Sequence, residues 1–366
     1  MMSKRLTRQW MNSKGTDLKK AFDRFIETSD KEPVQELKLN DKVLIIDGLN
    51  TFIRAFSVNP ALNEDGSHVG GIVGFLKSIR FAINRLQPTR VVIVFDGKGG
   101  SKKRRELYPE YKANRRVKSR LNRNVDWDVS PVDEDQSMKQ QISRLVNYLE
   151  VLPVKIISID GIEADDVMAY LAMTVFKESN IQLMSSDKDF LQLVSDRIKV
   201  WSPTKGILYD NKKVKEEFGI IPNNLLTWRT LDGDKSDNIN GIRGAGVKTV
   251  IKCFPEIADD KPFTVKDLIT KYSQMEPKYK LQKTLQENIN LVKRNYLLMQ
   301  LSNVQIHNRK KLLIQNSFDS NDEKLVKFQF QKMFIHDKLW GSLPDLDSWM
   351  IEFVRLNNYL RNKNVK

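Results

Sequence analysis

Acidic residues follow several of the apolar runs in this sequence. Asp47 and Asp96 come directly after such runs, and Asp187 comes two serines after another. Because the carboxyl ends of parallel strands meet at one edge of a sheet, these three side chains are expected to share a crevice. A single aspartate after a strand is often only a turn former or a helix cap, but three together favour a site.

Two further acidic groups extend this set. Glu163, Asp165 and Asp166 begin a predicted helix, where acids also complement the helix dipole, yet three exceed what a cap needs. Asp234 and Asp237 lie in the turn at 233–237, and Asp189 follows Asp187 by two residues. The candidates for one shared site are therefore nine carboxylates: Asp47, Asp96, Glu163, Asp165, Asp166, Asp187, Asp189, Asp234 and Asp237.

Carboxylates packed together without counter-charge repel one another, so a shared site requires bound cations. Oxygen ligands without a Cys or His ligand pair favour Mg²⁺ or Mn²⁺ over Zn²⁺. Two such ions about 4 Å apart can activate a water and stabilise the leaving oxygen of a phosphodiester. The pattern therefore predicts metal-dependent phosphodiester hydrolysis.

The chain is strongly basic, which points to a polyanionic partner or an anionic membrane surface. Its 366 residues contain 61 Lys and Arg against 46 Asp and Glu, a net charge of +15. Residues 98–124 hold 11 basic residues against two acids; the alternative interpretation of such a run is a solvated loop. The apolar runs are shorter than the roughly 18 residues of a membrane helix, and Cys253 alone excludes an internal disulfide. A cytoplasmic protein without a membrane partner is expected.

Short apolar runs alternate with helical stretches from residue 41 onward, which indicates an α/β domain with a mostly parallel sheet. Four segments are predicted. They are an N-terminal extension at 1–40, a core at 41–215 that includes a basic excursion at 98–135, a helical unit at 216–300, and a helical C-terminal extension at 301–366.

A glycine-rich turn at 241–246 lies between two predicted short helices. Glycine permits positive φ and close backbone approach, so the amides here can cradle a phosphate. Arg243 and Lys248 flank the turn, which favours a hairpin that grips a duplex backbone without reading bases.

Six motifs together resemble the 5′-nuclease family, which includes flap endonucleases and the 5′-3′ exonuclease domain of bacterial DNA polymerase I. They are IIDGLN at 45–50 with Arg54, FDGKGG at 95–100, ELYPEYKANR at 106–115, IEADDV at 162–167, SSDKDF at 185–190 and LDGDKSDNINGIRGAGVKT at 231–249. The resemblance implies a PIN-like core, a helical arch formed by residues 98–135 (the arch segment) and a helix-hairpin-helix unit at 216–300.

The resemblance also implies roles for single residues. Asp47, Asp96, Glu163, Asp165 and Asp187 match the first metal site, and Asp166, Asp189, Asp234 and Asp237 extend towards the second. Lys112 and Arg115 match basic side chains that contact the scissile phosphate, so they and Asp187 are the expected catalytic residues. The expected DNA contacts are Arg54, Lys98, Lys102, Lys103, Arg104, Tyr111, Lys112, Arg115, Gly241, Arg243, Gly244, Gly246, Lys248 and Thr249.

The expected function is a divalent-metal-dependent, structure-specific 5′-nuclease that removes RNA primers or 5′ flaps in DNA replication, with RNase H activity as an expected part. Its substrates are then branched or nicked duplex DNA and RNA–DNA hybrids with a free 5′ end. The resemblance also implies a K⁺ ion bound at the hairpin. The protein is expected to be a monomer, with a single-strand-binding protein or a sliding clamp as its partner. Two alternatives stay open: a non-catalytic DNA-junction binder, and a PIN-type ribonuclease acting on free RNA.

Overall fold

The computed structural model describes residues 37–116, 120–130, 132–320, 322–343 and 345–362. Almost all of the predicted N-terminal extension at 1–40 lies outside these residues, and the fold below concerns the unit that begins at Leu39.

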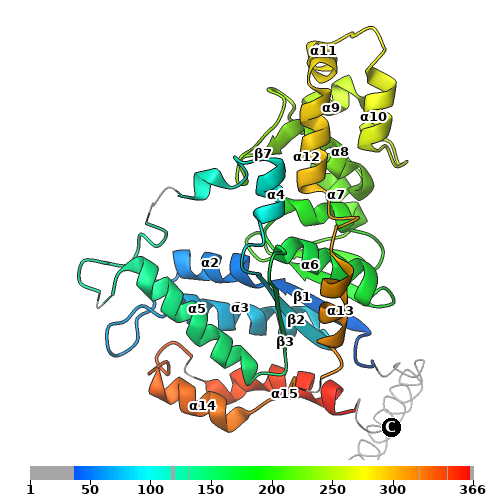
Figure 1. Cartoon of the computed structure of the whole chain (residues 1–366). Helices are drawn as coiled ribbons and strands as arrows, with labels where there is room; N and C mark the ends of the chain where they lie inside the picture. The colour runs from blue at the N-terminus through cyan, green and yellow to red at the C-terminus, as the bar shows by residue number, and fades with distance from the viewer. Residues whose placement is uncertain (1–36, 117–119, 131, 321, 344, 363–366) are drawn as a thin grey trace, which may run out of the picture. The chain divides into compact units, whose positions relative to one another are not determined.

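A six-stranded sheet forms the centre of this unit (Figure 1). Its strands are β1 Lys42–Asp47, β2 Arg90–Asp96, β3 Lys155–Ile159, β4 Asn180–Met184, β5 Ile198–Ser202 and β6 Ile207–Tyr209. They stand in the order β3-β2-β1-β4-β5-β6, and every neighbouring pair is parallel except β5 with β6. The mostly parallel α/β core that the sequence predicts is confirmed.

Helices cover both faces of the sheet because its central strands are apolar on both sides. In β1, Leu44 and Ile46 pack into one core and Val43 and Ile45 into the other. The first face carries α2 Gly48–Val58, α3 Gly70–Leu86 and α5 Glu134–Glu150; the second carries α6 Ala164–Tyr170, the π-helical turn η2 Leu171–Val175 and α7 Asn211–Phe218. The 3₁₀ turn η3 Lys188–Leu193 follows β4.

The arch segment connects β2 to α5. It contains α4 Lys102–Leu107 and the 3₁₀ turn η1 Ala113–Arg116. Its far end is fixed to the core, because buried Asn122 donates to the carbonyls of Phe56 and Asn59 and Trp127 stacks on Phe56. The described part of this excursion is therefore anchored at both ends.

The next unit is helical, as predicted. It comprises α8 Pro222–Asp232, the short strands β7 Gly233–Asp234 and β8 Ile239–Asn240, α9 Val247–Cys253, the 3₁₀ turn η4 Pro255–Ala258, α10 Val265–Tyr272, α11 Lys280–Glu287 and α12 Ile289–Met299. The glycine-rich turn lies between β8 and α9, where Gly244 adopts φ +86°.

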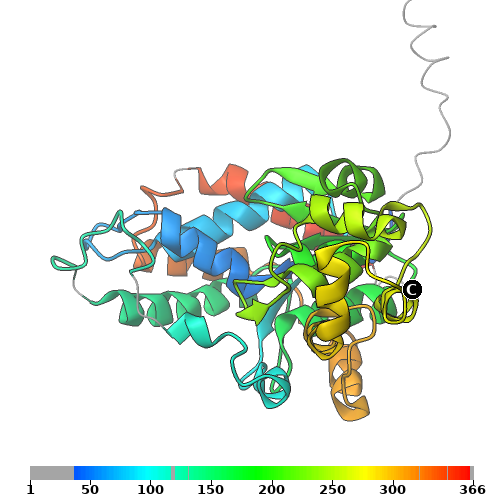
Figure 2. The same ribbon diagram turned by 90° about the horizontal axis from the view of Figure 1, so that it is seen from above.

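The C-terminal extension contains α13 Asn308–Asn316, α14 Lys327–His336 and α15 Leu346–Asn362. Helix α15 runs beside α3 (Figure 1 and Figure 2). Trp349 and Phe353 pack into the core on the face of the sheet that α3 covers. A buried ion pair between Arg90 and Glu323 joins the start of β2 to this extension. Among the described residues, no helix is both long and apolar enough to span a membrane.

Candidate active site

Three predicted aspartates lie at the carboxyl ends of neighbouring strands. Asp47 ends β1, Asp96 ends β2, and Asp187 follows β4. Asp47 caps α2 by accepting from the Asn50 amide at 3.0 Å, and it accepts from the Ser185 hydroxyl at 3.1 Å. Asp96 accepts from the Ala164 amide at 2.8 Å and so joins β2 to the start of α6. The capping role considered for single aspartates is real, but it uses only part of each carboxylate.

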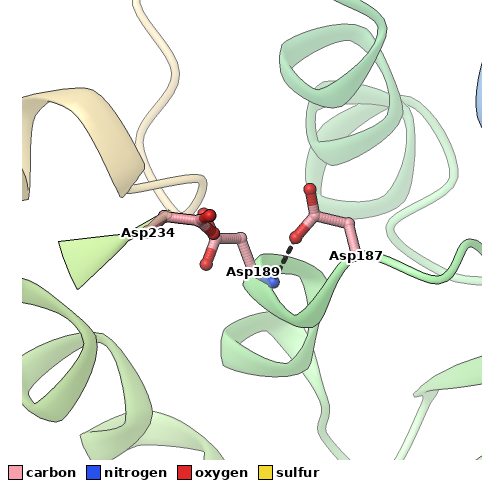
Figure 3. Close-up of side chains that lie close together, drawn as sticks. All are labelled: Asp187, Asp189 and Asp234. Atoms are coloured by element: carbon pink, nitrogen blue, oxygen red, sulfur yellow. Dashed lines mark hydrogen bonds between the residues drawn. The ribbon is translucent and has the colours of Figure 1, made fainter. Parts of the chain in front are cut away.

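Asp187, Asp189 and Asp234 form the tightest group. One carboxylate oxygen from each lies within 4.8 Å of the other two. Figure 3 shows Asp189 and Asp234 converging from two elements, with the Asp187 carboxylate beside them. Asp187 accepts from the Asp189 amide at 2.8 Å, and Asp234 accepts from the amide and hydroxyl of Ser236 at 2.7 and 2.6 Å.

The start of α6 supplies the remaining acids of the core. Glu163 is its N-terminal flanking residue, and Asp165 and Asp166 lie in its first turn. Arg104 donates to Glu163 at 2.5 Å and to Asp166 at 2.7 Å, and Lys112 donates to Glu163 at 2.5 Å. Both cations come from the arch segment, so this segment is held against the acidic cluster.

Tyr111 and Lys112 also bind the turn after β7. The buried Tyr111 hydroxyl donates to Asp237 at 3.0 Å, and the Lys112 amide donates to the Asp237 carbonyl at 2.8 Å. Lys112 has φ +56°, a left-handed conformation that costs a non-glycine residue free energy and recurs at functional sites. The surrounding bonds hold it there.

Burial raises the pKa of several carboxylates in this cluster, and neighbouring acids add to the effect. Burial, with Asp96 and Asp187 nearby, raises the pKa of Asp47 to about 7. Burial and Asp187 raise the pKa of Asp189 to about 7, despite Arg229. Burial followed by the neighbouring carboxylates also raises the pKa of Asp165 and of Asp187. By contrast, Arg104 and Lys112 outweigh burial at Glu163 and hold its pKa below the usual value.

All nine predicted acids thus belong to one cluster. Each is linked to another by a shared cation, a hydrogen bond or a direct charge interaction. The available ligand atoms are carboxylate oxygens, burial and neighbouring acids raise the pKa of four of these groups, and three oxygens lie within 4.8 Å of one another, close enough to share one ion. This chemistry fits hard divalent cations.

The hairpin places its predicted contacts at the surface. Arg243, Gly244, Gly246, Lys248 and Thr249 are exposed, whereas Ile242 and Ala245 between them are buried. A side chain at Gly244 or Gly246 would meet no atom within 4 Å, so another molecule's backbone has room to approach there. Gly241 instead packs against the carbonyls of Leu231 and Asp232, so its need for glycine is internal.

Other predicted DNA contacts are scattered. Lys98 and Lys102 are exposed, and Lys103 donates to the Gln305 carbonyl at 2.7 Å. Arg54 is half-buried on α2 and donates to Ser78 at 3.3 Å. Arg104 faces carboxylates, as described above, and the side chain of Arg115 lies outside the described part of the chain.

The sequence interpretation missed one member of the cluster, Arg229. This residue lies in the last turn of α8 and donates to Asp189 at 3.1 Å and to Asp234 at 2.5 Å. Its only sequence signal is its place shortly before the turn at 233–237, which an ordinary surface arginine would share.

Comparisons with known proteins agree with this geometry. Residues 42–219 match the family model "5′-3′ exonuclease, N-terminal resolvase-like domain". A 5′-3′ exonuclease of Bacillus subtilis is 33% identical over 226 residues, which cover 59% of this chain and 71% of that protein. A 5′-3′ exonuclease of Aquifex aeolicus is 32% identical, over 57% of this chain and 66% of that protein.

Longer relatives share only one part. The thermostable DNA polymerase I of Thermus aquaticus is 34% identical over 59% of this chain, but the match spans 24% of the polymerase. Among solved structures, a bacteriophage T5 flap endonuclease in complex with DNA and metal ions is similar in fold, with a TM-score of 0.57 and 20% identity over 81% of this chain and 99% of that one.

The extent of the match to the Bacillus exonuclease is enough to decide the family. The chain belongs to the 5′-3′ exonuclease family of structure-specific 5′-nucleases.

Proposed function

We propose that this chain hydrolyses phosphodiester bonds near the free 5′ end of branched or nicked duplex DNA, in a reaction that needs two or more Mg²⁺ ions. The observation that carries this proposal is the cluster of nine carboxylates from three strand ends, the start of α6, η3, and β7 with the turn after it, beside basic side chains of the arch segment.

The first ion would be held by Asp47, Asp96, Glu163, Asp165 and Asp187, and the second by Asp166, Asp189, Asp234 and Asp237. Divalent ions in such a site supply an activated water and charge stabilisation of the leaving oxygen. Mn²⁺ prefers the same oxygen ligands and is expected to substitute.

Lys112 orients and neutralises the scissile phosphate in this proposal. Its ammonium group has three donors, and in the structure it bonds to Glu163 and lies 3.8 Å from Asp237. With bound cations neutralising these carboxylates, the Lys112 ammonium would be free to bind a phosphate oxygen. Arg115 acts beside it. Tyr111 holds the part of the arch segment around Lys112 in place, because its hydroxyl donates to Asp237 and Glu163.

In this proposal the glycine-rich hairpin at 241–246 binds the duplex part of the substrate, away from the bond that is cleaved. Exposed Arg243 and Lys248, with the open backbone at Gly244 and Gly246, suit phosphate contacts that carry no base information. A K⁺ ion bound by backbone carbonyls of this turn belongs to the same proposal.

The biological substrates in this proposal are RNA primers and 5′ flaps left during DNA replication, so RNA–DNA hybrids are cut as well as DNA. A single-strand-binding protein or a sliding clamp is the proposed partner, docking outside the core.

The test uses three 5′-labelled substrates: a flapped DNA duplex, the same duplex with an RNA 5′ end, and the free RNA strand. Each is incubated with purified protein in Mg²⁺ or in EDTA. The proposal expects Mg²⁺-dependent cuts near the junction of both duplexes and little cutting of free RNA. Tight flap binding without cleavage in Mg²⁺ or Mn²⁺ identifies a junction binder, and preferential cutting of free RNA identifies a ribonuclease.

A further inference from the structure

A buried arginine from α8 lies inside the acidic cluster. The Arg229 side chain is 10% exposed, and its carboxylate partners Asp189 and Asp234 are 17% and 14% exposed. It also donates to the Gly233 carbonyl at 2.8 Å. Every nitrogen of its guanidinium group therefore has a carboxylate or carbonyl acceptor.

We infer that Arg229 is a fixed counter-charge to Asp187, Asp189 and Asp234, which offsets their mutual repulsion in the metal-free protein and sets how strongly a divalent ion is bound there. This inference rests on the proposed function, because it assumes that these three carboxylates hold a metal.

Two of the three carboxylates have hydrogen-bond partners besides Arg229. Asp187 accepts from the Asp189 amide in the first turn of η3. Asp234 uses its other oxygen to accept from Ser236 and from the Asp237 amide. Removing the guanidinium group thus removes a charge beside all three carboxylates and one hydrogen bond from each of Asp189 and Asp234.

The charges of this group balance one divalent ion. When all three carboxylates are ionised they carry −3, and Arg229 reduces this to −2. Without Arg229 the ionised, metal-free cluster carries the full −3 at short range, where partly buried charges interact strongly. The loss should destabilise the metal-free protein and should strengthen its attraction for a cation.

Arg229 differs in this respect from Arg104 and Lys112. Those two cations belong to the arch segment, and the proposed function releases Lys112 to a phosphate. Arg229 belongs to a helix that packs against η3 and α12 of the folded unit, so its charge stays in place when substrate arrives.

The test compares wild type, Arg229→Met, Arg229→Lys and the matched control Arg90→Met. The control breaks another buried ion pair, with Glu323, away from the acidic cluster. Tm is measured in EDTA and in saturating Mg²⁺, and Mn²⁺ affinity is measured without DNA by electron paramagnetic resonance. Neither readout depends on cleavage.

Arg229→Met should lose Tm in EDTA, regain most of it in Mg²⁺, and bind Mn²⁺ roughly tenfold or more tightly than wild type. Arg229→Lys keeps the charge and should respond to Mg²⁺ nearly as wild type does. Arg90→Met should lose Tm equally in both conditions.

Three results would overturn the inference. One is a Tm loss in Arg229→Met that Mg²⁺ repairs no better than in Arg90→Met. Another is weaker Mn²⁺ binding by Arg229→Met. The third is an Arg229→Met protein that stays unfolded in saturating Mg²⁺ while Arg90→Met folds. Wild-type cleavage of the flap substrate is unaffected by any of them, so failure here is distinct from failure of the proposed function.

Discussion

Replacing Asp47 by Asn should make the metal-free protein more stable while it abolishes cleavage. Asp47 is 6% exposed and forms no ion pair among the described residues, and burial with its acidic neighbours raises its pKa from 3.8 to about 7. Asn keeps an oxygen for the Asn50 amide and an amide group that can bond to Ser185. The substitution therefore removes the charge and keeps the contacts.

The magnitude follows from the shift in pKa. A rise of about three units means that ionised Asp47 costs the folded state about 4 kcal/mol at pH 8, above both values. A chain of 366 residues unfolds with an entropy of about 0.8 kcal/mol per kelvin, so Asp47→Asn should raise Tm in EDTA by about 5 °C.

The sign of the pH dependence is fixed by the same shift. Because the folded-state pKa lies above the unfolded value, wild type loses stability as pH rises from about 4 to 7. At pH 5 the folded protein keeps the proton, and the advantage of Asp47→Asn should shrink to less than about 2 kcal/mol.

The assay is thermal unfolding in EDTA at pH 5 and pH 8, followed by circular dichroism and repeated with Mg²⁺, which should stabilise wild type more than the variant. An Asp47→Asn protein that is equally or less stable than wild type in EDTA at pH 8 would refute the claim that burial and the neighbouring acids make ionised Asp47 unfavourable in the folded protein.

Three further predictions concern the arch segment, the hairpin and the C-terminal extension. Lys112→Ala should lower single-turnover cleavage of a flap about 10²- to 10³-fold while changing flap binding by less than tenfold. The exposed control Lys177→Ala should leave the rate near wild type. Equal losses in rate and binding would contradict the role of Lys112. Arg243→Ala and Lys248→Ala should each weaken duplex binding equally for all DNA sequences and reduce the slope of log affinity against log salt concentration by about 1. Fluorescence anisotropy at several salt concentrations measures both effects. A variant that changes sequence preference instead would count against backbone contacts. Asp337→Asn should destabilise the protein by about 1–3 kcal/mol at pH 7 in urea unfolding, because Asp337 accepts two hydrogen bonds from partly exposed Arg144 and one from Tyr148. Burial opposes ionisation of Asp337, but these bonds lower its pKa, so the stabilisation should disappear as pH falls below about 4. A loss of stability that persists at pH 2 would exclude this explanation.

The fold of the core could be predicted where single segments carry their own signal. Strands β1 and β2 contain continuous apolar runs, as expected for strands buried on both faces, whereas β4 is apolar except for Asn180 and Gln182. Strands β5 and β6 were not predicted. The first contains Lys199 between apolar residues and the second has three residues, so neither forms a run long enough to stand out.

The acidic cluster could be predicted because strand ends and one helix start fix where its backbone lies. The pairing of these acids with arginine and lysine side chains could not be predicted, because those side chains belong to segments distant in the sequence. Arg229 and Asp189 are 40 residues apart, and Arg104 and Asp166 are 62 apart. The same holds for the C-terminal extension, where Glu323 pairs with Arg90 across 233 residues. No local pattern in the sequence records such contacts.

The most direct test of the account is single-turnover cleavage of a 5′-labelled flap duplex in Mg²⁺ by wild type, Asp187→Asn and the exposed control Asp196→Asn, with flap binding measured in parallel. The account predicts that wild type and Asp196→Asn cut near the junction, and that Asp187→Asn binds the flap but does not cut it. Cleavage by Asp187→Asn at the wild-type rate would show that the carboxylate cluster is not where the phosphodiester is broken.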